Sequence, residues 1–183
     1  MGELLNTPGN YSNLICYKKT EIIYLITFFF CEHFLRKGDR TIDQMVQAAR
    51  SGKQNIIEGC AASATSSETE IKLINVAKAS LKELLEDYED FIKTRGFSKW
   101  EKGSKEYEYM RKLGAANASA SVIMEIVKTR PPETIANMAI ILLNQTDYLL
   151  HRLLENLEKR FLTEGGFREK MTRLRKKHRG DTF

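Results

Sequence analysis

The chain has 183 residues and a formal net charge of +5, from 29 Lys and Arg against 24 Asp and Glu. With 42% apolar and 29% charged residues, the composition excludes a wholly disordered, collagen-like or multispanning membrane protein. The charge is uneven, because residues 164–183 carry seven basic and three acidic groups while the rest of the chain is close to neutral. A neutral body with a basic tail bears on the protein's partners rather than on its fold.

The cysteines and the most apolar segment both indicate a cytoplasmic location. Cys16, Cys31 and Cys60 are widely spaced, with no CxxC pair, which predicts free buried thiols in a reducing compartment rather than a zinc site or a disulfide framework. The apolar run over residues 22–31 has about half of the roughly 20 residues that a membrane-spanning helix needs. Charged residues flank this run, so we expect a core helix and neither a signal peptide nor a membrane segment.

Composition favours helices through the whole chain, because prolines occur only at positions 8, 131 and 132. We expect one domain of ordinary size, preceded by a polar, turn-rich lead-in over residues 1–13 and followed by the basic tail. The apolar periodicity predicts helices over residues 18–37, 41–59, 68–94, 107–127 and 133–164. The tail is expected to be a short amphipathic helix or a disordered arm.

Local signals set the expected helix ends. The Thr41 hydroxyl is expected to cap the second helix, and Gly59 to end it, while Gly52 marks a close contact with another helix. Ser67 is followed three residues later by Glu70, which has the form of a capping box and predicts Ser67 as the cap of the third helix.

Few residues suggest catalysis. The sequence has no Gly-rich phosphate loop, no recognisable nucleophile and no Glu-x-x-His pair of the kind that holds two irons in helix bundles. Asp147, His151 and Glu155 share one helix face at i, i+4 and i+8, a spacing that suits a metal or acid–base site. A solvated face with charge pairing explains the same spacing and is the interpretation we favour. We therefore expect no enzyme, no cofactor and no metal.

Basic residues suggest a nucleic-acid interface in the tail. Arg168, Arg175 and Arg179 fall on one face of a helix, and such a patch binds phosphates in a salt-sensitive, largely sequence-independent way. A basic end that serves solubility alone is the equal alternative. The candidate nucleic-acid-binding residues are Arg168, Lys170, Arg173, Arg175, Lys176, Lys177 and Arg179, with Arg50 and Lys53 as secondary candidates.

A second group, around Trp100, mixes aromatic and charged residues. Trp100, Phe97, Tyr107 and Tyr109 stand among lysines, which would suit contact with a single strand. Interspersed glutamates dilute the positive charge, so we favour structural packing for these aromatic residues.

Two short motifs resemble a known family. Residues 47–59 end in Asn55-Ile56-x-Glu58-Gly59, and the next helix contains Ala77-x-Ala79-Ser80-x-x-Glu83. This order resembles the four-helix bundle proteins first noted as open reading frames inside 23S rRNA intervening sequences, over roughly residues 15–160. The extension that starts Gly-Gly-Phe-Arg resembles the subgroup called four helix bundle suffix proteins.

The resemblance implies an antiparallel up-and-down four-helix bundle over residues 14–163, with a basic C-terminal extension over residues 164–183. It also implies assembly as a homopentamer. The family includes the accessory protein of diversity-generating retroelements, which binds nucleic acid and a reverse transcriptase. Many relatives carry arginines after Glu-Gly, where this chain has none over residues 60–64.

We assign the motif residues to fold rather than to chemistry. Asn55 and Glu58 are expected to pair with backbone N–H groups of the loop after the second helix, and Gly59 to permit the turn. The structural motif residues are Asn55, Ile56, Glu58, Gly59, Ser80 and Glu83.

These observations predict a non-catalytic, oligomeric all-α protein that binds RNA, DNA or a nucleoprotein partner through basic surface. The alternative is a protein–protein scaffold without nucleic-acid binding. An enzyme built on Asp147, His151 and Glu155 comes third.

Overall fold

The computed structural model describes residues 11–179, apart from the side chains of Glu164, Phe167, Lys177 and His178. All elements over this range are helical, which confirms the all-α prediction. Most of the lead-in and the last four residues of the tail lie outside the described residues. The elements are η1 (Tyr11–Asn13), α1 (Ile15–Phe34), α2 (Arg40–Ala62), α3 (Ser67–Thr94), α4 (Lys105–Ala115), α5 (Ala120–Val127), α6 (Pro132–Glu164) and α7 (Phe167–Arg179).

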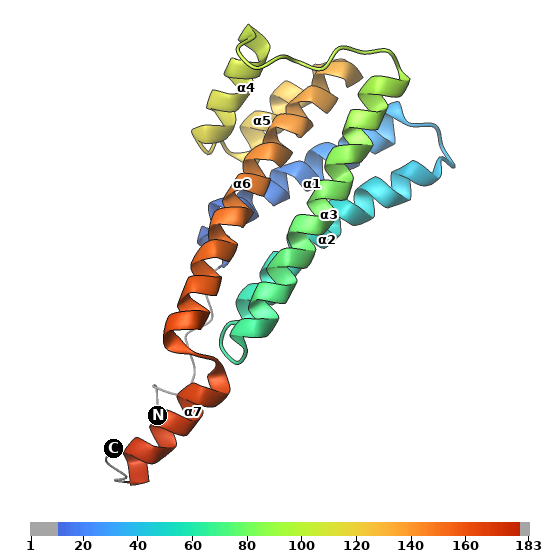
Figure 1. Ribbon diagram of the computed structural model, residues 1–183. Helices are drawn as coiled ribbons and strands as arrows, with labels where there is room; N and C mark the ends of the chain where they lie inside the picture. The colour runs from blue at the N-terminus through green and yellow to red at the C-terminus, as the bar shows by residue number, and fades with distance from the viewer. Residues whose placement is uncertain (1–10, 180–183) are drawn as a thin grey trace.

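The four long helices α1, α2, α3 and α6 lie side by side, and successive ones run in opposite directions (Figure 1). Helix α2 packs on α3, α3 on α6, and α1 on both α2 and α6, so one core forms between them. Aromatic side chains occupy part of this core: Phe30 lies 4.8 Å from Phe91 and 5.2 Å from Tyr88, between ring centroids. The Tyr88 hydroxyl donates to Thr27 Oγ1 at 3.0 Å, so its burial leaves no unpaired polar atom.

Two short helices cover one end of the long ones. Helix α4 packs on α6 and α5 packs on α1, and the segment from α3 to α4 passes over this end (Figure 1). Helix α7 lies at the opposite end, beyond the ends of α3 and α6 (Figure 1).

The apolar run over residues 22–31 lies within α1, and Ile23, Ile26 and Phe30 are fully buried, which confirms a core helix there. None of the described helices is long and apolar enough to cross a membrane. All three cysteines are buried free thiols, as predicted. Burial raises the pKa of the Cys16 thiol to about 11 and that of Cys31 to about 12.

Several predicted helix ends were wrong, and at the starts of α2 and α3 the reason is that a neighbouring polar residue takes the cap. Asp39, not Thr41, caps α2 by accepting a hydrogen bond from the Thr41 N–H at 2.9 Å. This bond lowers the pKa of the Asp39 carboxyl. Ser66, not Ser67, caps α3 by accepting from the Thr69 N–H at 3.1 Å. Helix α1 ends at Phe34 rather than at residue 37, because Leu35 takes an extended backbone conformation.

The helix predicted over residues 107–127 is two helices. Helix α4 ends at Ala115, Asn117 adopts a left-handed conformation with φ 52°, and Ser119 caps α5 by accepting from the Val122 N–H. Alanine propensity would continue one helix through this run. Packing overrides it, because the break lets α5 bury Ile123 and Val127.

Glycines let α2 approach α3 closely. A Cβ placed on Gly52 would lie 2.5 Å from Leu81 Cδ2, so the predicted close contact is confirmed. Gly59 was wrongly predicted to end the helix, since α2 continues to Ala62. Gly59 instead faces α3 as Gly52 does, and a Cβ there would lie 3.1 Å from Ile74 Cδ1.

We predict that Gly52→Ala destabilises the protein more than Gly59→Ala. Both positions lie inside α2, so the gain in helix propensity, about 1 kcal/mol, is common to the two variants. Overpacking costs about 1–3 kcal/mol, and at Gly52 the new Cβ would also lie 2.6 Å from the branched Leu81 Cγ. Urea unfolding followed by circular dichroism measures the difference. A Gly52→Ala protein as stable as Gly59→Ala would contradict this packing.

Candidate nucleic-acid interface

Helix α7 is joined to α6 by two glycines that fix the path of the chain. Gly165 has φ 77° and ψ 176°, a conformation that is essentially confined to glycine, and its N–H donates to Phe161 O at 2.9 Å. Gly166 lies directly before α7, and its carbonyl accepts the first hydrogen bond of the helix, from the Lys170 N–H at 3.0 Å. The Glu169 carboxylate accepts from the Gly166 N–H at 2.9 Å, which is one half of a capping box.

The charge of α7 is almost entirely positive. Its 13 residues hold seven basic groups and one acid, Glu169, which is engaged at the start of the helix. Met171 and Leu174 are half-buried on one face, so the cations spread over the remaining circumference. The exposed basic residues are Arg168, Arg173, Arg175, Lys176 and Arg179. Lys170 is half-buried, and the Lys177 side chain lies outside the described part of the chain.

Of the two alternatives for the tail, the structure therefore gives a helix over residues 167–179. Six of the seven predicted tail residues have described side chains, and the structure brings these together on α7.

The secondary candidates lie elsewhere. Arg50 is exposed on α2, but Lys53 is half-buried and its Nζ lies 4.5 Å from the centroid of the Tyr24 ring. Both residues precede the end of α2 by two turns or more, about 14–18 Å along the helix. The structure does not gather them with the basic residues of α7.

The motif residues do not pair with loop N–H groups as predicted. Asn55 Nδ2 donates backwards along α2, to Ser51 O at 2.9 Å and Ser51 Oγ at 3.1 Å. Glu58 is exposed, and Gln54 Nε2 donates to its carboxylate at 3.4 Å. The prediction failed because α2 runs past Gly59, so the following loop begins too far from Asn55.

The motif instead marks the α2–α3 contact. Ser51 Oγ lies 2.9 Å from Ser80 Oγ, so Asn55, Ser51 and Ser80 form a hydrogen-bonded chain between the two helices. Ile56 is fully buried beside it. Sequence reasoning missed Ser51, although its place one turn before Asn55 and next to Gly52 was a usable signal.

Glu83 belongs to a groove between α2 and α3 that is polar and acidic. Gln47, Ser51, Ser80, Glu83 and Asp87 line it. Burial, together with Asp90 and Glu83, raises the pKa of the Asp87 carboxyl. Two carboxylates make this groove unsuitable for phosphate, which leaves α7 as the phosphate-binding candidate.

Asp147 and Glu155 form ion pairs with different neighbours, so the side chains of Asp147, His151 and Glu155 do not meet at one point. Asp147 lies 3.7 Å from Lys78 Nζ on α3, and Glu155 pairs with His151 at 3.6 Å and with Arg152 at 3.4 Å. Within residues 11–179, no group of three or more His, Cys, Asp and Glu side chains is arranged to hold a metal ion.

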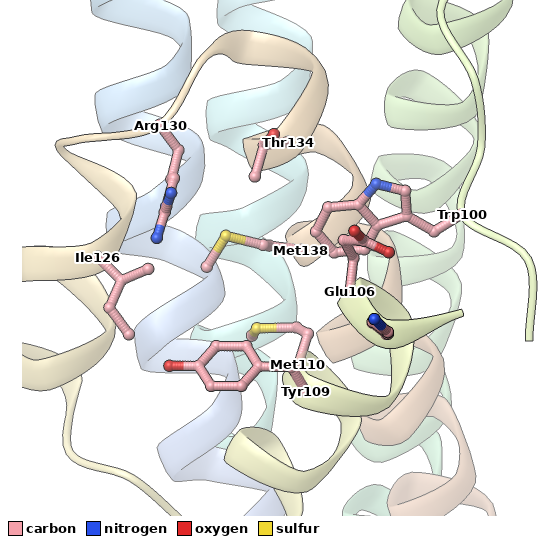
Figure 2. Close-up of a pocket in the computed structure, with 9 residues that line it drawn as sticks. Trp100, Glu106, Tyr109, Met110, Ile126, Arg130, Thr134 and Met138 are labelled. Carbon is pink, nitrogen blue, oxygen red and sulfur yellow. The ribbon is translucent and has the colours of Figure 1, made fainter. Parts of the chain in front are cut away.

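Of the aromatic residues around Trp100, Trp100 itself and Tyr109 line a cavity at the α4 end of the molecule. Phe97, Trp100 and Tyr107 are half-buried against the core, as the packing interpretation predicted, whereas Tyr109 is 59% exposed. The cavity has a volume of about 420 Å³. Figure 2 shows Trp100 and Glu106 on one side, Arg130 and Ile126 on the other, with Met110 and Met138 between them.

This cavity can hold an apolar group but carries no catalytic arrangement. Its most buried lining residues are Met110 and Met138, and its charged groups, among them Glu106 and Arg130, are exposed. It lies at the end of α6 opposite to α7 (Figure 1), so it is not part of the basic surface.

No family model, curated protein or solved structure matches this chain.

An ion pair supports the end of the molecule from which α7 projects. Arg160 on α6 donates through Nη2 to Glu70 Oε2 on α3 at 2.6 Å. The Glu70 side chain is 9% exposed, and burial raises the pKa of its carboxyl while Arg160 lowers it. This pair ties the first turn of α3 to the last turns of α6.

We predict that Arg160→Met destabilises the protein at pH 8 by about 1–3 kcal/mol, while Arg160→Lys costs less. The figure lies below that of a fully buried pair because Arg160 is 41% exposed. Without Arg160, the folded-state pKa of Glu70 rises further above its unfolded value. The loss of stability in Arg160→Met is therefore complete above the folded-state pKa of Glu70. It fades as the pH falls from that pKa towards the unfolded value of 4.5, because the buried carboxyl takes up a proton over this range.

Urea unfolding of both variants at pH 8 and pH 5 checks this. A cost of Arg160→Met that is independent of pH would show that Glu70 is not the group left unpaired.

Proposed function

We propose that this chain is a non-catalytic, oligomeric helical protein that binds RNA, DNA or a nucleoprotein partner through α7. The observation that supports this most strongly is the charge and placement of one helix. Seven basic groups lie within 13 residues of α7, against one acid that caps the helix itself. The helix lies past the end of the bundled helices, where a polyanion can reach it (Figure 1).

The dimensions of α7 suit a phosphate backbone. Thirteen helical residues span about 20 Å, the axial length of about six nucleotides of one duplex strand. The exposed cations spread around the part of the helix surface that Met171 and Leu174 do not occupy, so several of them can reach phosphates at once. Such contacts displace condensed counterions and depend little on sequence.

The proposal includes the fold and the family. Helices α1, α2, α3 and α6 form an antiparallel up-and-down four-helix bundle, with α4 and α5 inserted before its last helix. We propose membership of the 23S rRNA intervening sequence protein family, supported by the motif over residues 55–59 and by Ser80 and Glu83. Assembly as a homopentamer, and a partner such as a reverse transcriptase, would follow from that membership. The buried free thiols support a cytoplasmic location.

A protein–protein scaffold is the second candidate, and its contacts would use exposed apolar residues. Leu25 and Phe28 are exposed on the outer face of α1, and Tyr148 on α6 is 63% exposed. These side chains could serve self-assembly under either proposal, so they do not separate the two.

We predict that binding to nucleic acid weakens strongly when most of the positive charge of α7 is removed. The variant replaces Arg168, Arg173, Arg175, Lys176 and Arg179 by Gln, and the matched control replaces Arg50 and Lys53 by Gln. Fluorescence anisotropy with a single-stranded RNA and a duplex DNA, over a salt series, gives the affinities. We expect the slope of log K against log salt to fall by about 3–5 in the α7 variant and by less than about 1 in the control.

Equal slopes for the α7 variant and the wild type would overturn the assignment to α7. A wild-type oligomer in light scattering that binds neither nucleic acid at low salt would favour the scaffold.

A further inference from the structure

A cavity of about 330 Å³ lies where α1, the α4–α5 connection and α6 meet. It is separate from the basic helix α7 and from the cavity beside Trp100. Its buried lining includes Lys19 and Ile22 from α1, Gly114 from α4, Ile123 from α5 and Leu142 from α6. One charged group therefore lies among apolar side chains.

Lys19 is a buried cation with no counter-charge among the described residues. The residue is 5% exposed, and its Nζ donates to Gly114 O at 2.6 Å and to Gln145 Oε1 at 3.0 Å. Both acceptors are neutral, and an ammonium has a third N–H to donate. Burial lowers the pKa of Lys19, and within the described residues no carboxylate lies at ion-pair distance to oppose this.

The position of Lys19 is fixed by other contacts. Gln145 Nε2 donates to Arg111 O at 2.9 Å, so this amide joins α6 to the end of α4 while its oxygen receives the ammonium. A Cβ on Gly114 would overlap the Gln145 amide, so the close approach requires glycine there. The protein thus holds a desolvated cation in place at a cavity, which is costly unless something compensates the charge.

The first turn of α5 borders the same cavity. Ala118, Ser119 and Ala120 line it, and the N–H groups at the start of a helix have no acceptor within that helix. The Ser119 hydroxyl accepts from the Val122 N–H, which leaves the Ala120 N–H at the cavity without an intrahelical partner. Asn117, in its left-handed conformation, completes this edge.

The exposed rim is balanced in charge. Lys18 and Glu21 line it, one on each side of Lys19 in sequence, so the rim contributes no net charge. The positive charge inside the cavity therefore comes from Lys19 and from the start of α5.

We propose that this cavity binds a small organic carboxylate. The carboxylate of this ligand accepts a hydrogen bond from Lys19 Nζ, near the first N–H groups of α5. The short hydrocarbon chain of the ligand packs on Ile22, Ile123 and Leu142. The apolar lining favours a carboxylate with a hydrocarbon chain over inorganic phosphate, whose oxygens would be desolvated against these side chains.

The test uses the full-length protein and sodium butyrate, with butyramide as the neutral analogue and inorganic phosphate as the other anion. Butyrate has six heavy atoms, so a Kd of about 1 mM is a reasonable expectation, well within the limit for small ligands. Amide shifts in ¹H–¹⁵N spectra report both affinity and place. We expect shifts at residues 117–123 and in α1 around Lys19, and binding of butyramide about tenfold weaker or more.

Lys19→Met removes the cation and keeps the side-chain length, whereas Lys18→Met is the matched control on the rim. We expect butyrate binding to weaken about tenfold or more in Lys19→Met and to be unchanged in Lys18→Met. Thermal unfolding and the spectrum of Lys19→Met establish that it is folded. If that variant does not fold, the wild-type comparison of butyrate with butyramide decides.

Absence of shifts at about ten times the expected Kd would overturn the proposal. Equal binding of butyramide, tighter binding of phosphate, or unchanged binding in a folded Lys19→Met protein would overturn it as well.

Discussion

Helix α6 buries one apolar face against α1 and α3, from Ile135 to Leu157, and this burial determines where every other feature can lie. A continuous helix of 33 residues is about 50 Å long, so it extends from the α4–α5 end of the molecule to the α7 end. Gln145 on α6 accepts a hydrogen bond from Lys19 near the α4–α5 end, and Arg160, some four turns further along α6, pairs with Glu70. Where the apolar face ends, Gly165 ends the helix and α7 begins.

The periodicity of the sequence predicted the long helices and their buried faces well, because one strong signal, an apolar stripe, specifies each of them. Helix ends were predicted unevenly: α3 and α6 end at Thr94 and Glu164 as expected, whereas the ends of α1 and α2 and the capping residues of α2 and α3 were wrong. Ser66 and Ser67 are adjacent and both have hydroxyl groups. Which of them caps α3 depends on the backbone conformation, which the amino-acid sequence does not show directly. The break at Asn117 was missed because alanine propensity was outweighed by the burial of Ile123.

The candidate sites differ in how visible they are in sequence. The basic residues of α7 are contiguous, so they could be found by counting charges. Lys19 was overlooked because a lysine is expected at the surface. Yet it stands three residues before Ile22 and four before Ile23, which is the buried side of α1, and that spacing was an available signal. Its acceptors, Gly114 O and Gln145 Oε1, lie 95 and 126 residues away, so no local pattern could identify them.

The central claim is that a neutral helical body presents one basic helix to a polyanion. Ultraviolet cross-linking of a single-stranded RNA to the wild-type protein, with the linked peptides mapped by mass spectrometry, tests this most directly. The account predicts cross-links concentrated within residues 167–179 that weaken as salt is raised. Cross-links concentrated on α1 or α2, or none at low salt, would contradict it.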